Sequence, residues 1–263
     1  DHDGTISTLR EGWEHDMAPM MMDAIFGADP EGVDPDLQAR VRAEVEAYIS
    51  QTTGLRTLVQ MEGLARLVEA RGLVPPEGIL DPRTYKEIYL QKLHRSVDRR
   101  MAELASGERT PTDFTIRGAV AFLKELGRRG IKLFLASGTD AVHLRPEAAA
   151  LGYADLFDGG IYGAEDNSAD EPKKIVLEKI LAQMSTAPAS GFVAFGDGPV
   201  EIREAVKRGG VGVGVASDEI RRCGLNPAKR ERLVLAGAHF VVPDFSQADQ
   251  LLDLLFPQPA VRL

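Results

Sequence analysis

DHDGT, residues 1–5, is the stretch around which the rest of the chain is organised. Asp1 and Asp3 are separated by one residue, so an extended backbone places both carboxylates on the same side. Gly4 then permits a sharp turn. Two neighbouring carboxylates at a turn suit a metal ion and a nucleophile, although Asp-Gly is also an ordinary turn signal. The stretch becomes specific through three other segments that lie far from it in the sequence.

The composition is that of an ordinary globular protein. Its 263 residues are 44% hydrophobic and 27% charged, which suffices for one large domain or two smaller ones. A net charge of -9 disfavours nucleic acids and anionic membranes as partners. The single cysteine, Cys223, excludes an internal disulfide and fits a reducing compartment. With no bilayer-length apolar run and no signal-peptide pattern, we expect a soluble cytoplasmic protein, and its oligomeric state stays open.

Residues 12–107 follow a helical pattern. Apolar residues at spacings of three and four predict helices over about 34–52, 55–72 and 85–104. No segment with the period of a strand interrupts them. We therefore predict an all-helical domain over residues 12–107, inserted into a second domain formed by residues 1–11 and 108–263.

From residue 108 onward, helical runs alternate with short apolar runs. These runs cover 131–136, 192–195, 211–215 and 239–242, and their Val, Ile and Phe content suits strands buried on both faces. The helices between them would serve as crossover connections. The predicted fold class is α/β, with a Rossmann-like parallel sheet, helices on both of its faces, and the inserted helical domain.

Polar or glycine-rich residues follow each predicted strand. Sites in open α/β sheets form at the carboxyl ends of strands, so functional side chains are expected there. A carboxylate at such an edge is normally carried there by a buried apolar strand, and the printed sequence has none before Asp1. We therefore expect the sequence to be trimmed at its N-terminus. As printed, it places a free α-amino group beside the site. The segments that follow the strands are 137–139, 196–198, 217–218 and 243–244.

Four segments resemble, in order, the four motifs of the haloacid dehalogenase superfamily. They are Asp1-x-Asp3-Gly4-Thr5, Ser137, Lys173 and Gly196-Asp197-Gly198-Pro199-Val200-Glu201. The helical block between the first two resembles the cap of C1-capped members, such as the phosphoglycolate phosphatase and β-phosphoglucomutase branch. Each motif is weak alone, but their order and spacing extend the resemblance over nearly the whole chain.

The resemblance implies a Mg²⁺-dependent phosphatase that forms an aspartyl-phosphate. Asp1 would be the nucleophile, and Asp3 the acid that protonates the leaving oxygen and then activates water. An Asp two residues after the nucleophile resembles the pattern of the phosphatases and phosphomutases of this superfamily, since its dehalogenases, phosphonatases and cation pumps lack an Asp at that position. Asp1, Asp197 and the main-chain carbonyl of Asp3 would hold Mg²⁺. Glu201 would ligate it directly, ligate it through water, or only stabilise a helix that begins at Pro199.

A phosphoryl group needs positive charge and hydrogen-bond donors around it. Ser137 and the backbone of Gly138 resemble its phosphate-binding residues. Lys173 and Lys174 open a predicted helix, where the helix dipole disfavours cations, so an anion is expected nearby. That anion is the phosphoryl group with Asp1, or else a plain surface partner at 170–171. Lys173 is our choice for the catalytic lysine, and Lys174 stays as the phosphate-binding alternative.

Three residues are candidate substrate contacts. Arg10 follows the first motif, at the hinge into the helical block, and Arg56 and Gln60 belong to a segment from Thr53 onward that interrupts the helical pattern. An ordinary interhelical turn explains that break equally well.

We expect a small phosphate ester as substrate, a sugar or polyol phosphate. A phosphomutase with the same residues is the nearest alternative, and a non-catalytic phosphometabolite-binding protein is another. A nucleic-acid end phosphatase is disfavoured by the acidic charge balance and by the lack of a basic, aromatic-rich groove.

Overall fold

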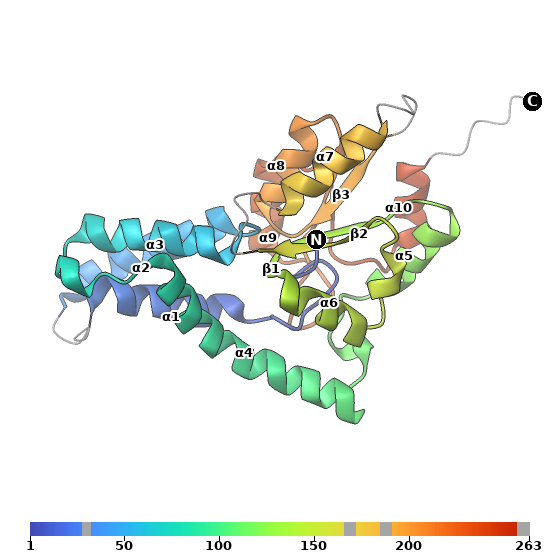
Figure 1. Ribbon diagram of the computed structural model, residues 1–263. Helices are drawn as coiled ribbons and strands as arrows, with labels where there is room; N and C mark the ends of the chain where they lie inside the picture. The colour runs from blue at the N-terminus through green and yellow to red at the C-terminus, as the bar shows by residue number, and fades with distance from the viewer. Residues whose placement is uncertain (28–32, 166–171, 185–190, 257–263) are drawn as a thin grey trace, which may run out of the picture.

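The computed structural model describes residues 1–27, 33–165, 172–184 and 191–256 (Figure 1). Four helices come first along the chain. They are α1 (Trp13–Phe26), α2 (Pro35–Thr52), α3 (Thr57–Arg71) and α4 (Pro82–Ser106), and they form the left and lower parts of the molecule in Figure 1. The three helices predicted between 34 and 104 are thereby confirmed, with Asp34 and Asp81 accepting hydrogen bonds from the first turns of α2 and α4.

Helices α1 to α4 enclose an apolar core of their own. Its buried side chains include Met17, Val45, Leu64, Tyr89 and Val97. This packing supplies the stability that short isolated helices lack in water. The boundaries of a separate unit, 12–107, stay a prediction.

The rest of the chain alternates helices and strands, which confirms the α/β class. All the strand pairs are parallel, in the orders β1-β2 and β3-β4-β5. The elements are α5 (Ala119–Arg128), β1 (Phe134–Asp140), α6 (Ala141–Ala150), β2 (Gly160–Ala164), α7 (Pro172–Met184), β3 (Val193–Gly196), α8 (Pro199–Lys207), β4 (Val211–Val215), α9 (Pro227–Leu235), β5 (Phe240–Val242) and α10 (Ala248–Leu255).

Two details of the strand prediction were wrong. Residues 137–139 were predicted to follow the first strand, but they lie within β1, where the pairing to β2 becomes irregular after Ala136. Strand β2 was not predicted at all. Only Ile161 and Tyr162 in it are large and apolar, so it forms no apolar run.

Helices cover both faces of the strands, as predicted. On one face, Phe122 of α5, Leu144 of α6 and Leu251 of α10 share a core with Leu135 and Val213. On the other, Ile202 of α8 packs with Leu233 of α9, and Leu177 of α7 packs with Phe192. The carboxyl ends of the strands are therefore the part of the sheets left open for a site.

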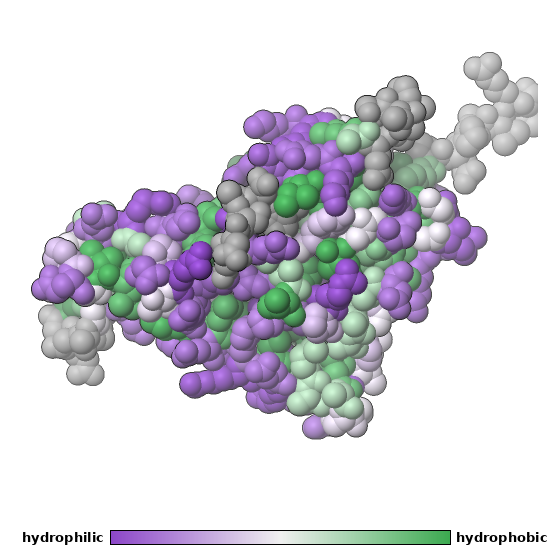
Figure 2. Space-filling model, in the orientation of Figure 1, coloured by the Kyte–Doolittle hydropathy of each residue, from purple (hydrophilic) through white to green (hydrophobic). Residues whose placement is uncertain are grey.

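Hydrophilic side chains dominate the face of the molecule seen in Figure 2, with apolar residues in scattered patches. Within the described residues, the helices are too short or too polar to traverse a bilayer. The net charge of -9 fits this hydrophilic exterior.

Candidate active site

Asp1 lies at the carboxyl end of β3. Its backbone nitrogen donates to the carbonyl oxygen of Phe195 at 2.9 Å, and burial lowers the pKa of this α-amino group to about 6. Its carboxylate is held at both oxygens: Oδ1 accepts from the backbone N–H of His2 at 2.8 Å, and Oδ2 accepts from Nζ of Lys173 at 3.0 Å. The candidate nucleophile is thus fixed in position.

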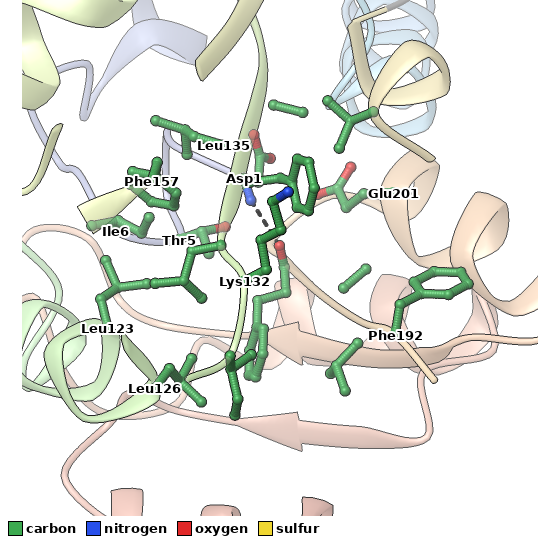
Figure 3. Close-up of a pocket in the computed structure, with 18 of the residues that line it drawn as sticks. Asp1, Thr5, Ile6, Leu123, Leu126, Lys132, Leu135, Phe157, Phe192 and Glu201 are labelled. Carbon is green, nitrogen blue, oxygen red and sulfur yellow. Dashed lines mark hydrogen bonds between the residues drawn. The ribbon is translucent and has the colours of Figure 1, made fainter. Parts of the chain in front are cut away.

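The carboxylates of Asp1, Asp197 and Glu201 converge. One oxygen from each lies within 4.8 Å of the others. Figure 3 shows Asp1 and Glu201 at the same end of a cavity. Glu201 Oε1 also accepts from the backbone N–H of Gly198 at 2.7 Å, so this residue both stabilises the start of α8 and faces the cluster.

The structure separates the two neighbouring lysines. Nζ of Lys173 lies 3.0 Å from Asp1 Oδ2 and 3.0 Å from Glu201 Oε2, and the side chain is 8% exposed. Lys174 is 53% exposed and lies 3.9 Å from Glu178, its neighbour on the same helix. The alternative partners suggested for Lys173, at 170–171, lie outside the described residues.

Lys229 was missed by the sequence analysis. Its Nζ lies 2.7 Å from Asp197 Oδ2 and 2.5 Å from Glu219 Oε1. Burial raises the pKa of Asp197, but the charges of Lys229 and Arg232 outweigh burial and lower it. Lys229 lies in the first turn of a helix that begins at Pro227, the same kind of position that suggested Lys173 from the sequence. The sequence pattern could therefore have predicted Lys229 as well.

Asp3 faces a different set of groups from the other three carboxylates. Its Oδ2 accepts from the hydroxyl of Thr139 at 2.7 Å and, more weakly, from that of Ser137 at 3.3 Å. Its Oδ1 is buried without a hydrogen-bond partner and lies 3.8 Å from Nε of Arg10. Asp3 therefore has one oxygen anchored by two hydroxyl groups and the other buried beside Arg10.

Arg10 forms a buried ion pair with Glu147, a partner that the sequence analysis did not identify. The guanidinium donates to the two carboxylate oxygens at 2.5 and 3.2 Å. His2 lies 3.4 Å from the same carboxylate and bonds Tyr153 through its other ring nitrogen. Arg10 also lies 3.8 Å from Asp3, so its charge acts on two carboxylates, of which Glu147 is the nearer.

Glu147→Gln is expected to lower the free energy of unfolding at neutral pH. It is also expected to reduce the amount by which that free energy falls in acid. Burial raises the pKa of Glu147, but the hydrogen bond with His2 and the charge of Arg10 outweigh burial and bring the pKa down to about 2 from an ordinary 4.5. The carboxylate therefore stabilises the fold fully above about pH 4.5, and this contribution is lost as pH falls towards 2. Removing the charge also leaves the buried Arg10 with the more distant carboxylate of Asp3, 3.8 Å from Nε, which costs about 1 to 3 kcal/mol.

Urea unfolding at pH 7 and pH 3 measures this effect. The variant should be less stable at pH 7, and it should lose less stability between the two pH values than the parent. Glu178→Gln removes an exposed carboxylate as the control and should match the parent. An unchanged free energy of unfolding for Glu147→Gln at both pH values would contradict the assignment.

The connection between α2 and α3 lies directly against the site. A Cβ at Gly54 would come within 2.6 Å of Glu201 Oε2 and 3.1 Å of Lys173 Nζ, and a Cβ at Gly138 within 2.6 Å of the carbonyl oxygen of Leu55. Of the two predicted contacts there, Gln60 lines the small cavity and bonds the hydroxyl of Thr52 at 3.2 Å. Arg56 is buried and donates to the carbonyl oxygen of Glu165 at 3.2 Å.

A cavity of about 90 Å³ joins these groups. It is lined from the strand side by Asp1, Asp3 and Ser137, and from the helical block by Trp13 and Gln60. One water needs roughly 10 to 15 Å³ of such space, so the cavity has room for a phosphoryl-sized group and little more. Of the predicted site residues, Asp1, Asp3, Ser137, Gly138, Lys173 and Asp197 meet here with Arg10 and Gln60, and Glu201 touches Lys173.

One comparison with known proteins identifies the family of this chain. Residues 3–209 match the family model described as haloacid dehalogenase-like hydrolase. No match was found among curated protein sequences. Among solved structures of similar fold, a predicted phosphatase from Clostridium acetobutylicum has 16% identity, a TM-score of 0.56 and coverage of 95% of each chain. A protein from Bacteroides vulgatus assigned as a β-phosphoglucomutase has 16% identity and a TM-score of 0.57, with coverage of 97% of this chain and 88% of that one. A predicted phosphoglycolate phosphatase from Haemophilus somnus 129pt has 12% identity and a TM-score of 0.56, with coverage of 95% of this chain and 94% of that one. At these identities the structures establish the fold alone.

Proposed function

Because the chain belongs to the haloacid dehalogenase-like hydrolase family, we propose that it is a Mg²⁺-dependent phosphatase of a small phosphate ester, such as a sugar or polyol phosphate. The observation that carries the proposal is the convergence of Asp1, Asp197 and Glu201 within 4.8 Å, with Lys173 between two of them. Asp3 lines the same small cavity as Asp1.

The carboxylate cluster fits a divalent ion. Asp1, Asp197 and Glu201 offer hard oxygen ligands, the type that Mg²⁺ prefers. Lys173, Lys229 and Arg232 bring three positive charges to this cluster. The three carboxylates and that of Glu219, which shares Lys229, bring four negative charges, so an excess of one negative charge remains. When bound, Mg²⁺ would neutralise charge on the phosphoryl oxygens.

In the proposed first step, a carboxylate oxygen of Asp1 attacks the phosphorus of the ester. The bond from phosphorus to the ester oxygen breaks, and that oxygen takes the proton of Asp3 and leaves as an alcohol. The position of Asp3 supports this role, because it lines the same small cavity as Asp1. Anchoring of Oδ2 by Thr139 would orient the carboxyl group.

In the second step, Asp3 takes a proton from water, and the resulting hydroxide attacks the phosphorus of the aspartyl-phosphate. The bond from phosphorus to Asp1 breaks, which releases inorganic phosphate and restores Asp1 and protonated Asp3. Lys173, the hydroxyl of Ser137 and the backbone of Gly138 would donate to the phosphoryl oxygens in both steps. Lys173 reaches Asp1 already, at 3.0 Å, which places its charge where the phosphoryl group would arrive.

We assign the helical block over residues 12–107 the role of a cap. The lining of the small cavity by Trp13 and Gln60 together with Asp1 and Ser137 supports this role, because the cap would then exclude water from the reacting groups. The cavity volume of about 90 Å³ favours a small leaving group.

Gly54→Ala tests the contact between this cap and the site. Gly54 has φ +95°, and an added Cβ would meet Glu201 Oε2 at 2.6 Å. Displacing the connection by a fraction of an ångström is expected to lower kcat/KM roughly 10- to 100-fold. Gly72→Ala is the matched control, because Gly72 has φ +61° but open space around it. Gly72→Ala should cost some thermal stability from backbone strain and keep kcat/KM within about twofold. Equal kcat/KM in the two variants would rule out a role for the Gly54 contact.

A panel of phosphate esters, with Mg²⁺ and with EDTA, tests the proposed function. We expect release of inorganic phosphate from at least one small ester, loss of release with EDTA, and recovery on adding excess Mg²⁺. An isomerised sugar phosphate without free phosphate would instead identify a phosphomutase. If no ester is turned over but one raises the melting temperature, the protein binds phosphometabolites without catalysis.

A further inference from the structure

The small cavity at the site has two sides of different chemistry. Its strand side carries the charged groups of Asp1, Asp3 and Lys173. In the proposed mechanism the transferred phosphoryl group occupies that side, so the leaving group meets the side formed by the helical block. The lining from the helical block is uncharged and includes Trp13, Met17, Thr57, Gln60, Tyr89 and Leu93.

The cations that line the cavity already have anionic partners. Among the described residues these cations are Lys173 and Arg10. Lys173 lies between two carboxylates of the candidate metal site. Arg10 pairs with Glu147 and also lies 3.8 Å from Asp3. A second anionic group on the substrate would therefore lose its water beside Asp3 without gaining a cation of its own, which is unfavourable. The charges at the cavity thus favour a leaving group that is uncharged.

Tyr89 brings an unused hydrogen-bonding group to this cavity. Its side chain is 3% exposed, and its hydroxyl forms no hydrogen bond with any other described residue. Burial raises the pKa of Tyr89, so the hydroxyl keeps its proton at neutral pH and can donate. After burial, the charges that act most on this pKa are those of Arg10 and Asp3, and both residues line the cavity. The hydroxyl therefore lies on the cavity side of the ring.

Tyr85 shows what a purely structural tyrosine looks like on the same helix. It lies one turn before Tyr89 on α4 and is also 3% exposed. Its hydroxyl accepts from the backbone N–H of Leu80 at 3.2 Å, so the fold itself uses that group. A buried hydroxyl without a partner is destabilising, and phenylalanine would fill the same space without this cost. A ligand that bonds the hydroxyl accounts for a tyrosine at position 89.

We propose that the leaving group of the substrate is uncharged and carries a hydroxyl group that bonds Tyr89. The inference rests on the phosphatase function proposed above and narrows its substrate class to small polyol esters that have neither a carboxylate nor a second phosphate. Trp13, Met17 and Leu93 would cover the carbon-bound hydrogens of such a group. Tyr89 is then a residue that determines specificity, without a part in the bond-breaking steps.

Three esters with three carbon atoms each test the proposal. They are glycerol 3-phosphate, 3-phosphoglycerate, which carries a carboxylate in place of the free hydroxymethyl group, and propyl phosphate, which has no hydroxyl group. We expect kcat/KM for glycerol 3-phosphate to exceed that for either of the others by roughly 10-fold or more. A site with a buried hydrogen-bonding group discriminates against an analogue that leaves this group unpaired.

Tyr89→Phe separates binding of the ester from a structural role. It should lower the ratio of kcat/KM for glycerol 3-phosphate to that for propyl phosphate roughly 10-fold. Its melting temperature should be no lower than that of the parent, because the hydroxyl has no partner in the fold to lose. Tyr85→Phe is the matched control. It should have a lower melting temperature, because it loses the bond to Leu80, and it should keep the ratio within about twofold.

The outcomes distinguish this inference from the proposed function. If the parent releases phosphate but accepts 3-phosphoglycerate as well as glycerol 3-phosphate, or if Tyr89→Phe leaves the ratio unchanged, the phosphatase stands and the inference is overturned. If no ester is turned over, the phosphatase falls, and melting temperatures with each ester and Mg²⁺ decide the inference. Glycerol 3-phosphate should then stabilise the parent more than the other two esters do, and more than it stabilises Tyr89→Phe. Equal shifts would overturn the inference.

Discussion

Asp1→Asn is expected to lower phosphate release on the order of 10⁵-fold while leaving the fold intact. The amide keeps the size of the side chain, but its single oxygen replaces two accepting oxygens, which now bond His2 at 2.8 Å and Lys173 at 3.0 Å, so one of these hydrogen bonds is lost. It is a far poorer nucleophile than the carboxylate. Initial rates of phosphate release measure the loss, and circular dichroism with thermal melting checks the fold.

Mass spectrometry of the acid-quenched protein separates a chemical role from a structural one. With substrate present, the parent should carry a phosphoryl group on the peptide that contains Asp1, and Asp1→Asn should not. Asp253→Asn, an exposed substitution on α10, should behave as the parent in every assay. Undiminished turnover by Asp1→Asn would refute the aspartyl-phosphate mechanism.

Lys173→Met is expected to lower kcat by roughly 10²- to 10³-fold, the range seen when one donor to the reacting group is removed. Methionine keeps most of the buried volume and loses the charge. Because Lys173 lies 3.0 Å from both Asp1 and Glu201, the substitution also leaves these carboxylates to repel each other. Kinetics at saturating ester and Mg²⁺ measure kcat, and melting temperature reports the structural cost.

Lys174→Met is the matched control, one residue along the same helix. Its side chain is 53% exposed and, within the described part of the chain, lies 3.9 Å from the carboxylate of Glu178 on the same helix. We expect kcat within about twofold of the parent, since exposed pairs contribute little. Equal kcat losses in the two variants, or a loss confined to Lys174→Met, would contradict the choice of Lys173.

Local sequence patterns predicted much of the secondary structure and of the site. The apolar residues in 34–52 recur at spacings of three and four, a local pattern that identified α2 without knowledge of the fold. The same holds for Pro199 and Glu201 at the start of α8, where the helix end itself favours both residue types. Strand β2 was not predicted, because two of its five residues are glycines and its apolar stretch is short. Its strand structure depends on pairing with β1, 26 residues earlier in the chain.

The sequence by itself determined which chemical groups the chain brings to the site: carboxylates at Asp1, Asp3, Asp197 and Glu201, and a lysine at a helix start. Only the tertiary structure decided which of them meet. Lys173 and Lys174 point about 100° apart on one helix, and packing alone turns the first towards Asp1. Packing likewise commits Arg10 to Glu147, 137 residues along the chain, and Lys229 to Asp197. Local backbone preferences depend on neighbouring residues in the sequence, whereas these ion pairs form only when distant elements pack against each other.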